Sequence, residues 1–293
     1  MDGELLRHLY HRLFESDSAR TSGGVIYSDA IIALMYFFAV LNNKSPHWAH
    51  ANRNCWPLWA RRLRFPSYSQ LMRRLKEIDP LIQQLNDEFR GQLPSGPDKI
   101  CDGKPLLVGG DSKDPDAAWG RIPGDGWAKG YKSHVIIDES SGAIDAIDVT
   151  ALDGGEPTAT RRLIRKMDLT GGVTLRGDCN YDSNPLYRDV AERGGRLIAP
   201  RKKPGRGIGH HPQDPDRLRA IAELEGDPAN MRAHRHRRIQ VEQRLAHLTN
   251  LPFGLAPLPN CVRRLPRVRQ WVKTKAMLYH LYRILSQPNA LAA

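Results

Sequence analysis

The chain has 293 residues, of which 40% are hydrophobic, and it carries a formal net charge of +12. This length is enough for one large domain with a small one and for a substantial buried core, and the positive charge favours a polyanionic partner such as nucleic acid. The four scattered cysteines argue against zinc ribbons and disulfide frameworks and for a reducing cytosol, and the longest apolar stretch, residues 30–41, is too short to span a bilayer.

Residues 1–98 are predicted to be mainly helical. Ser67 and Gln70 have the spacing of a capping box, which opens a helix with basic side chains on one side. A further helix is predicted at 81–89. The Pro- and Gly-containing stretch 93–97 has the composition of a linker, so the helical part is predicted to end there.

The rest of the chain alternates strand and helix patterns. Apolar runs predict strands at 106–111, 132–138, 143–150, 172–178 and 196–200. Amphipathic segments predict helices at 156–167, 183–193, 229–248 and 267–285. This order favours an α/β fold with a mixed five-stranded sheet flanked by helices. The predicted division is a helical N-terminal domain at 1–98 and an α/β domain at 99–293 that includes the C-terminal helix.

Three acidic residues stand where their side chains can serve chemistry. Asp111 and Asp178 each end an apolar run, and Glu242 follows Arg238 by one helical turn. Carboxylate oxygens suit hard cations such as Mg²⁺, and two such ions about 3.5–4 Å apart support phosphodiester cleavage. The pattern therefore predicts a divalent-metal site formed by the three acids. For Glu242 alone, a surface ion pair with Arg238 remains the alternative.

Basic side chains flank these acids and also gather in the helical part. Contact with DNA phosphates is predicted for Arg201, Lys202, Lys203, Arg235, Arg238, Arg73 and Arg74. The last two lie in the helical domain, which is therefore predicted to bind DNA, although a count of helices does not establish a helix-turn-helix.

Other motifs favour structural roles. Asp114 and Asp116 lie in a Pro-containing loop and are predicted to serve turn geometry. Two histidine pairs, 210–211 and 234/236, have no partner cluster at zinc spacing and are predicted to be solvated basic side chains. The Gly-rich pieces are not followed by Lys and Ser or Thr, so ATP binding is unsupported.

The order of the motifs resembles that of the DDE transposases of bacterial insertion sequences, whose catalytic domain is ribonuclease H-like. Segment 108–112 resembles the first-strand aspartate motif, and 130–142 resembles the hairpin that follows it. Segment 177–183 resembles the Asp-x-x-Tyr-Asp motif. Arg238-x-x-x-Glu242 resembles the helix that bears the third acid. The resemblance covers about residues 104–250.

The resemblance implies that Asp111, Asp178 and Glu242 form the catalytic, metal-binding triad and that Arg238 contacts phosphate. It implies a cofactor of two Mg²⁺ or Mn²⁺ ions. It also implies double-stranded DNA as the partner, at the transposon ends and at the target, bound by a homodimer in the bacterial cytoplasm at the nucleoid. The helical domain would bind the terminal inverted repeats, and a cleaved 3′-hydroxyl would attack target DNA. A related subgroup has Tyr and Lys where this chain has Arg235 and Thr249.

Three alternatives remain. A metal-dependent nuclease on the same fold would cut DNA without joining it. A catalytically inactive remnant would bind DNA in a salt-sensitive manner without cleaving it. A recombinase that uses a covalent tyrosine needs no carboxylate triad and would leave a protein–DNA adduct.

Overall fold

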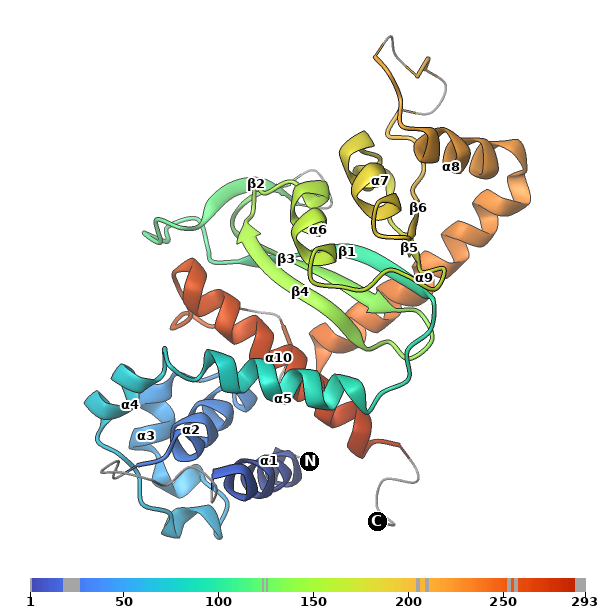
Figure 1. Cartoon of the computed structure of the whole chain (residues 1–293). Coiled ribbons are helices and arrows are strands. Elements are labelled where there is room, and N and C mark those ends of the chain that lie inside the picture. Colours follow the sequence, from blue (N-terminus) through green and yellow to red (C-terminus); the bar gives the residue numbers. More distant parts are fainter. Residues whose placement is uncertain are drawn as a thin grey trace. The chain divides into compact units, whose positions relative to one another are not determined.

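Six strands form a mixed sheet in the described part of residues Leu93–Thr249, here called the sheet unit (Figure 1). They are β1 (Asp98–Leu107), β2 (Ala118–Ile122), β3 (Gly126–Asp138), β4 (Ile144–Ala151), β5 (Thr174–Arg176) and β6 (Arg196–Ile198). The order is β2-β3-β1-β5-β6, and β4 pairs with the part of β3 that β2 leaves open. β3 is antiparallel to β1, whereas β5 and β6 run parallel to it.

The computed structural model describes residues 2–17, 27–122, 124, 126–203, 206–208, 211–251, 254–255 and 258–287. The predicted mixed sheet flanked by helices, a ribonuclease H-like α/β fold, is confirmed, although the sheet has one strand more than the five predicted. The additional strand is β2, which lies in a segment whose glycines and aspartates favoured a loop.

Strand β1 begins and ends earlier than the apolar pattern predicts. The prediction was 106–111, but β1 ends at Leu107. Pro105 is tolerated in this central strand because β5 pairs only with its first residues, 98–100. The N–H of Val108 donates to Lys129 on β3, so by alternation the prolyl nitrogen faces away from β3, where no hydrogen bond is required.

Helices α6 (Glu156–Ile164) and α7 (Asn184–Ala191) form the core of the sheet unit together with the strands. Leu186 and Val190 lie one turn apart on α7 and are fully buried, as the amphipathic pattern predicts. They pack with Leu175 of β5 and Ile136 of β3. Helix α8 (Pro215–Gly226) contacts α7 and β6, and α9 (Pro228–Asn250) follows it.

A second compact unit, here called the helical unit, comprises Met1–Gln92 and Asn250–Ala293. Its helices are α1 (Asp2–Asp17), α2 (Asp29–Leu41), α3 (Pro46–Ala51), α4 (Tyr68–Arg74), α5 (Asp79–Gly91) and α10 (Leu265–Leu285), with two short 3-10 turns. The capping box of Ser67 and Gln70 is present at the start of α4. None of the helices in the described ranges combines the length and apolarity needed to cross a bilayer.

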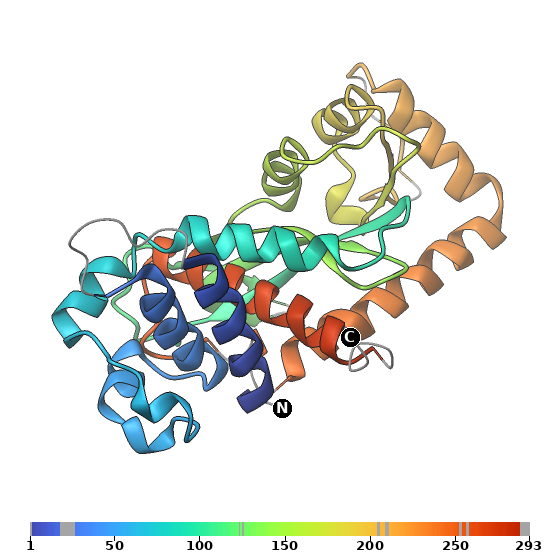
Figure 2. The ribbon, with the colours of Figure 1, turned by 60° about the horizontal axis from the view of Figure 1, so that its bottom comes forward.

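The C-terminal helix α10 groups with the N-terminal helices, which differs from the predicted division at residues 98 and 99. It contacts α5, α2 and α1 (Figure 2, α10 in red, α1 and α2 in blue). The ammonium of Lys275, fully buried on α10, donates to the Val40 carbonyl at 2.8 Å and to the Asn43 side chain at 2.7 Å. Such long-range contacts leave no local signal in the sequence.

Candidate active site

The parallel pairing of β1 with β5 brings two aspartates together where β5 ends. The register pairs Ile100 with Arg176, and its continuation by two residues sets Asp102 beside Asp178. Residues at equivalent positions of neighbouring strands share a face of the sheet. The Asp178 carboxylate also accepts a hydrogen bond from the N–H of Asn180 at 2.7 Å, which orients it in the turn after β5.

Helix α9 places a cation and a third acid next to this pair. The Arg238 guanidinium lies 3.9 Å from the Asp178 carboxylate and 3.4 Å from the Glu242 carboxylate. One turn earlier, Nε2 of His234 lies 3.1 Å from the carbonyl oxygen of Gly177. The helix is therefore anchored to the residue just before Asp178. The Glu242 side chain is 59% exposed, so its pairing with Arg238 contributes little to stability.

Asp102 is a partly buried carboxylate in an acidic environment. Burial raises its pKa to about 6, and the negative charges of Asp178 and Glu156 act in the same direction. The N–H of Gly103, which donates to the carboxylate at 2.8 Å, and the charge of Arg238 oppose this rise. Two neighbouring carboxylates of which one is desolvated are stabilised by a bound cation, because the cation offsets both repulsion and burial.

The donor set fits a divalent metal ion in its chemistry, since hard cations prefer carboxylate oxygens. Among the described residues, however, no three acidic, histidine or cysteine side chains already lie close enough to hold an ion. The reason is local: the guanidinium of Arg238 contacts both Asp178 and Glu242. Asp102, Asp178 and Glu242 therefore offer the carboxylate oxygens that a cation would use, with Arg238 in contact with the last two.

Asp111 lies farther along the chain than the end of β1, no described contact joins it to these acids, and its place in the triad remains a prediction. Asp111 is exposed in the turn after β1, where the N–H of Ser112 donates to Gly109 at 3.3 Å. The Ser112 carbonyl accepts from the Lys129 ammonium at 2.6 Å, so this turn is tied to the β2–β3 hairpin. At about 3.3 Å per residue, the end of β1 lies about 15 Å from Asp102. Asp102 carries no local sequence signal because it lies inside a polar strand.

The loop after β5 depends on a glycine and a buried tyrosine. A Cβ atom at Gly177 would lie 2.6 Å from the ring of Tyr181, so no larger residue fits without a shift. Tyr181 is fully buried, and burial raises the pKa of its phenol well above the usual value. The ring therefore supports the turn that presents Asp178.

Two other predictions have structural outcomes. The turn role of Asp114 is confirmed: its carboxylate accepts from the N–H of Asp116 at 3.2 Å and from the Tyr131 hydroxyl at 2.5 Å. The prediction that His234 is solvated is wrong, since only 2% of it is exposed. Burial lowers the pKa of His234 to about 4, so the ring is neutral at neutral pH. His210 lies outside the described residues.

The cations predicted to contact DNA fall into three groups. Lys202, Lys203, Arg235 and Arg73 are exposed. Arg201 forms a two-pronged ion pair with Glu225, and Arg74 donates to Asp29 and to the Tyr27 carbonyl. Arg238 lies in the acidic site, as described above. Contact of these residues with DNA remains a prediction.

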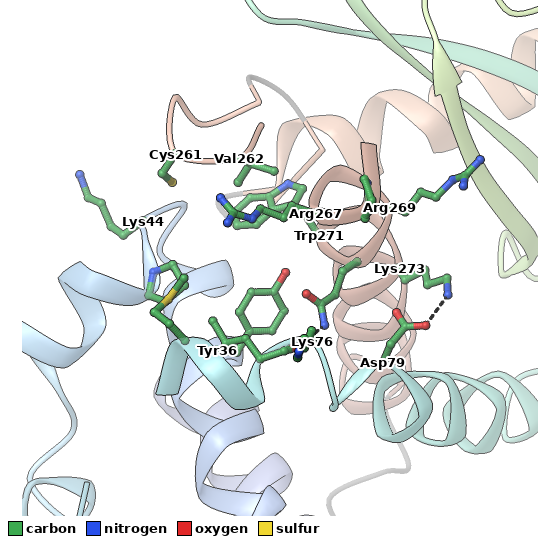
Figure 3. A pocket seen from close by; sticks show the side chains of 15 residues that line it. Tyr36, Lys44, Lys76, Asp79, Cys261, Val262, Arg267, Arg269, Trp271 and Lys273 are labelled. Carbon is green, nitrogen blue, oxygen red and sulfur yellow. Dashed lines mark hydrogen bonds and ion pairs between the residues drawn. The ribbon is translucent and has the colours of Figure 1, made fainter. Parts of the chain in front are cut away.

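The helical unit contains a cavity of about 490 Å³ with a basic lining (Figure 3). Its cationic residues are Lys44, Lys76, Arg267, Arg269 and Lys273. Asp79 pairs with Lys273 at 2.9 Å, and Tyr36 and Trp271 belong to the wall. The cavity lies beside the C-terminal end of α4, the helix that carries Arg73 and Arg74. The helical unit therefore carries five cationic side chains around this cavity in addition to Arg73 and Arg74, the two that were predicted to contact DNA.

A mixed sheet of this order, with acids on β1 and after β5 and a third acid on a later helix, defines the ribonuclease H-like class. Residues 95–281 match the model of the transposase DDE domain family, and the chain belongs to that family. DDE transposase domains generally use divalent metal ions.

Among solved structures, the chain is similar to a piggyBac transposase in a synaptic complex with hairpin DNA. The TM-score is 0.52 at 12% sequence identity, over 97% of this chain and 73% of the other. At this identity the similarity concerns the fold alone. No curated protein is significantly similar to the chain.

Proposed function

We propose that this chain is the DNA transposase of a bacterial insertion sequence, and that it cuts the terminal inverted repeats and joins them to target DNA. The observation that carries the proposal is the electrostatic interaction of Asp102 with Asp178, with Arg238 and Glu242 of α9 next to Asp178. Three acids and one arginine at the end of a ribonuclease H-like sheet suit phosphodiester chemistry far better than they suit stability.

Each residue has a role that follows from its position. Asp102 and Asp178 bind the cations, and Glu242 completes the site when a DNA phosphate engages Arg238. An arginine prefers a two-pronged contact with phosphate, which would release Glu242 from its weak ion pair. His234 fixes the position of α9. Two Mg²⁺ or Mn²⁺ ions would activate the attacking oxygen and stabilise the leaving oxygen.

The proposed partner is double-stranded DNA, at the transposon ends and at the target, bound by a homodimer at the nucleoid. The net charge of +12 and the exposed cations Lys202, Lys203 and Arg235 support contact with DNA phosphates. The helical unit, with Arg73 on α4 and the basic cavity nearby, is proposed to bind the terminal repeats. In this proposal α10 belongs to the end-binding module.

Cleavage of the element's own ends tests the proposal. A plasmid that carries the DNA flanking the gene is incubated with Mg²⁺ and either the wild type or Asp178→Asn. The wild type is expected to cut at the inverted repeats, and the variant is expected to bind the same DNA without cutting it. Undiminished cutting by Asp178→Asn contradicts the proposal. No cutting by either protein with Mg²⁺ or Mn²⁺ favours the inactive remnant.

Strand transfer separates a transposase from a nuclease on the same fold. Pre-cut end DNA with a free 3′-hydroxyl is offered together with a circular target. A transposase is expected to join the two, which is detected as a labelled product of higher molecular weight. Cutting without any joined product favours the nuclease.

A further inference from the structure

The hairpin of β2 and the first residues of β3 exposes two tryptophans. Trp119 is 52% exposed and Trp127 is 63% exposed, although large aromatic side chains are usually buried. Neither residue takes part in the site described above. Exposed apolar surface with polar side chains around it marks an interaction site more often than an accident of folding.

The strand register places these tryptophans on one face with two cations. Trp119 pairs with Lys129, and Arg121 pairs with Trp127. Directly opposite residues of antiparallel strands share a face, and so do residues two apart along one strand. The Arg121 guanidinium lies 6.0 Å from the centre of the Trp127 ring. These four residues are here called the hairpin face.

The hairpin face lies on the same side of the sheet as Asp102, although Tyr131 and Ser133 between them are buried. Val135 pairs with Asp102, and every second residue of β3 from Val135 back to Trp127 shares its face. At about 3.3 Å per residue, Lys129 lies about 20 Å and Trp127 about 26 Å along the strand from Val135.

We propose that the hairpin face binds the unpaired bases of a DNA strand. The proposal rests on the DNA chemistry proposed above. Tryptophan rings stack on bases that are free of a duplex, and neighbouring cations bind the phosphates between them, which is the composition of single-strand binding surfaces. The bases of an intact duplex already stack on one another and offer no free ring surface.

A second copy of this chain fits the same surface less well. Two copies of the hairpin face would bring Arg121 and Lys129 of one copy close to those of the other, on chains of net charge +12. Like charges that meet at an interface disfavour association. A polyanion carries the complementary charge, so DNA is favoured over self-association.

Binding of a labelled 20-nucleotide oligo-dT and of a duplex of equal length tests the proposal by fluorescence anisotropy. Trp127→Ala and Trp119→Ala are each expected to weaken single-strand binding by about tenfold, the order expected for one lost stacking contact. Duplex affinity is expected to stay within about twofold and also shows that the variants fold. Trp127→Phe is expected to restore most of the lost affinity, and Leu218→Ala, an exposed apolar site on α8, is expected to leave binding unchanged.

Three outcomes overturn the inference. The first is single-strand binding that both alanine variants retain. The second is an equal loss for single strand and duplex. The third is a wild-type dimer that becomes monomeric in Trp127→Ala by light scattering while DNA binding is unchanged. Asp178→Asn separates this inference from the proposed function, since it is expected to lose cutting and keep oligo-dT binding.

Discussion

One face of the sheet carries clustered negative charge at one end and exposed aromatic surface at the other. Where β5 ends, Asp102 and Asp178 bring negative charges together, with Asp102 partly buried. Where β2 ends, Trp119 and Trp127 leave aromatic surface in water. Bound cations would offset the negative charges at Asp102 and Asp178, here called the acidic end. An apolar ring with a negative charge beside it would cover the aromatic surface of Trp119 and Trp127, here called the hairpin end. A DNA strand with its metal ions would supply both kinds of partner.

The largest expected effect is at the acidic end. Asp102→Asn and Asp178→Asn are each expected to reduce Mg²⁺-dependent cleavage by about a hundredfold or more, because each would remove a charged oxygen ligand with little change in side-chain volume. Cleavage rates on end-containing DNA measure the effect. If Asp102→Asn cuts at the wild-type rate, Asp102 is not a metal ligand of the cleavage site.

A steric change in the turn after β5 is expected to have the next largest effect. Gly177→Ala places a Cβ atom 2.6 Å from the Tyr181 ring, and such overpacking costs about 1–3 kcal/mol in the free energy of unfolding. Urea unfolding measures the loss. Gly155→Ala is the matched control, because its nearest neighbour would lie 3.9 Å away. An equal change in the two variants shows that the turn is not tightly packed.

The anchor of α9 predicts an acid sensitivity. Burial lowers the pKa of His234 to about 4, against an ordinary value of 6.5, so protons bind preferentially to the unfolded chain as the pH falls below 6.5. The stabilisation is therefore present above pH 6.5 and is lost as the pH falls toward 4. Between pH 7 and pH 5 the wild type is expected to lose about 2 kcal/mol more unfolding free energy than His234→Gln loses.

Chemical unfolding at pH 7 and at pH 5, followed by circular dichroism, measures this difference. His134 and His280 are also buried with lowered pKa values, but they are present in both proteins and their contributions cancel. Parallel loss of stability in the wild type and in His234→Gln contradicts the buried, neutral state of His234.

The smallest effect is expected at Asp111. This side chain is exposed in a turn at the base of the hairpin, and Asp111→Asn is expected to change the cleavage rate by less than about threefold. The comparison with Asp102→Asn uses the same DNA and metal. A large loss of cleavage in Asp111→Asn would place Asp111 in the catalytic site. The site would then reach the hairpin, and the two ends of the sheet face would not differ in function.

The sequence predicted the elements whose signals are local. Asp178 follows a short apolar run, and Arg238 and Glu242 lie one turn apart on a helix, so their positions could be predicted. Asp102 could not, because β1 combines polar residues with Pro105 and is recognised as a strand only by its pairing with β3 and β5. The apolar run that follows Asp102 ends just before Asp111. It therefore predicted a strand that ends at Asp111, whereas β1 ends at Leu107.

The hairpin face did have a sequence signal. Trp119, Arg121, Trp127 and Lys129 alternate with small or apolar residues on either side of a turn-like segment, which is the period of a strand pair. The glycines and aspartates around them favoured a loop instead. The membership of α10 in the helical unit had no such signal, because it follows from contacts between residues more than 200 positions apart, such as Lys275 with Val40 and Asn43.

Metal binding by single variants tests the central claim, that Asp102 and Asp178 together hold the cations. Electron paramagnetic resonance of Mn²⁺ added to the DNA-bound protein counts the tightly bound ions in the wild type, Asp102→Asn, Asp178→Asn and Asp111→Asn. The account predicts that the first two variants lose tightly bound Mn²⁺ and that Asp111→Asn retains it. Retention by Asp102→Asn together with loss by Asp111→Asn contradicts the account.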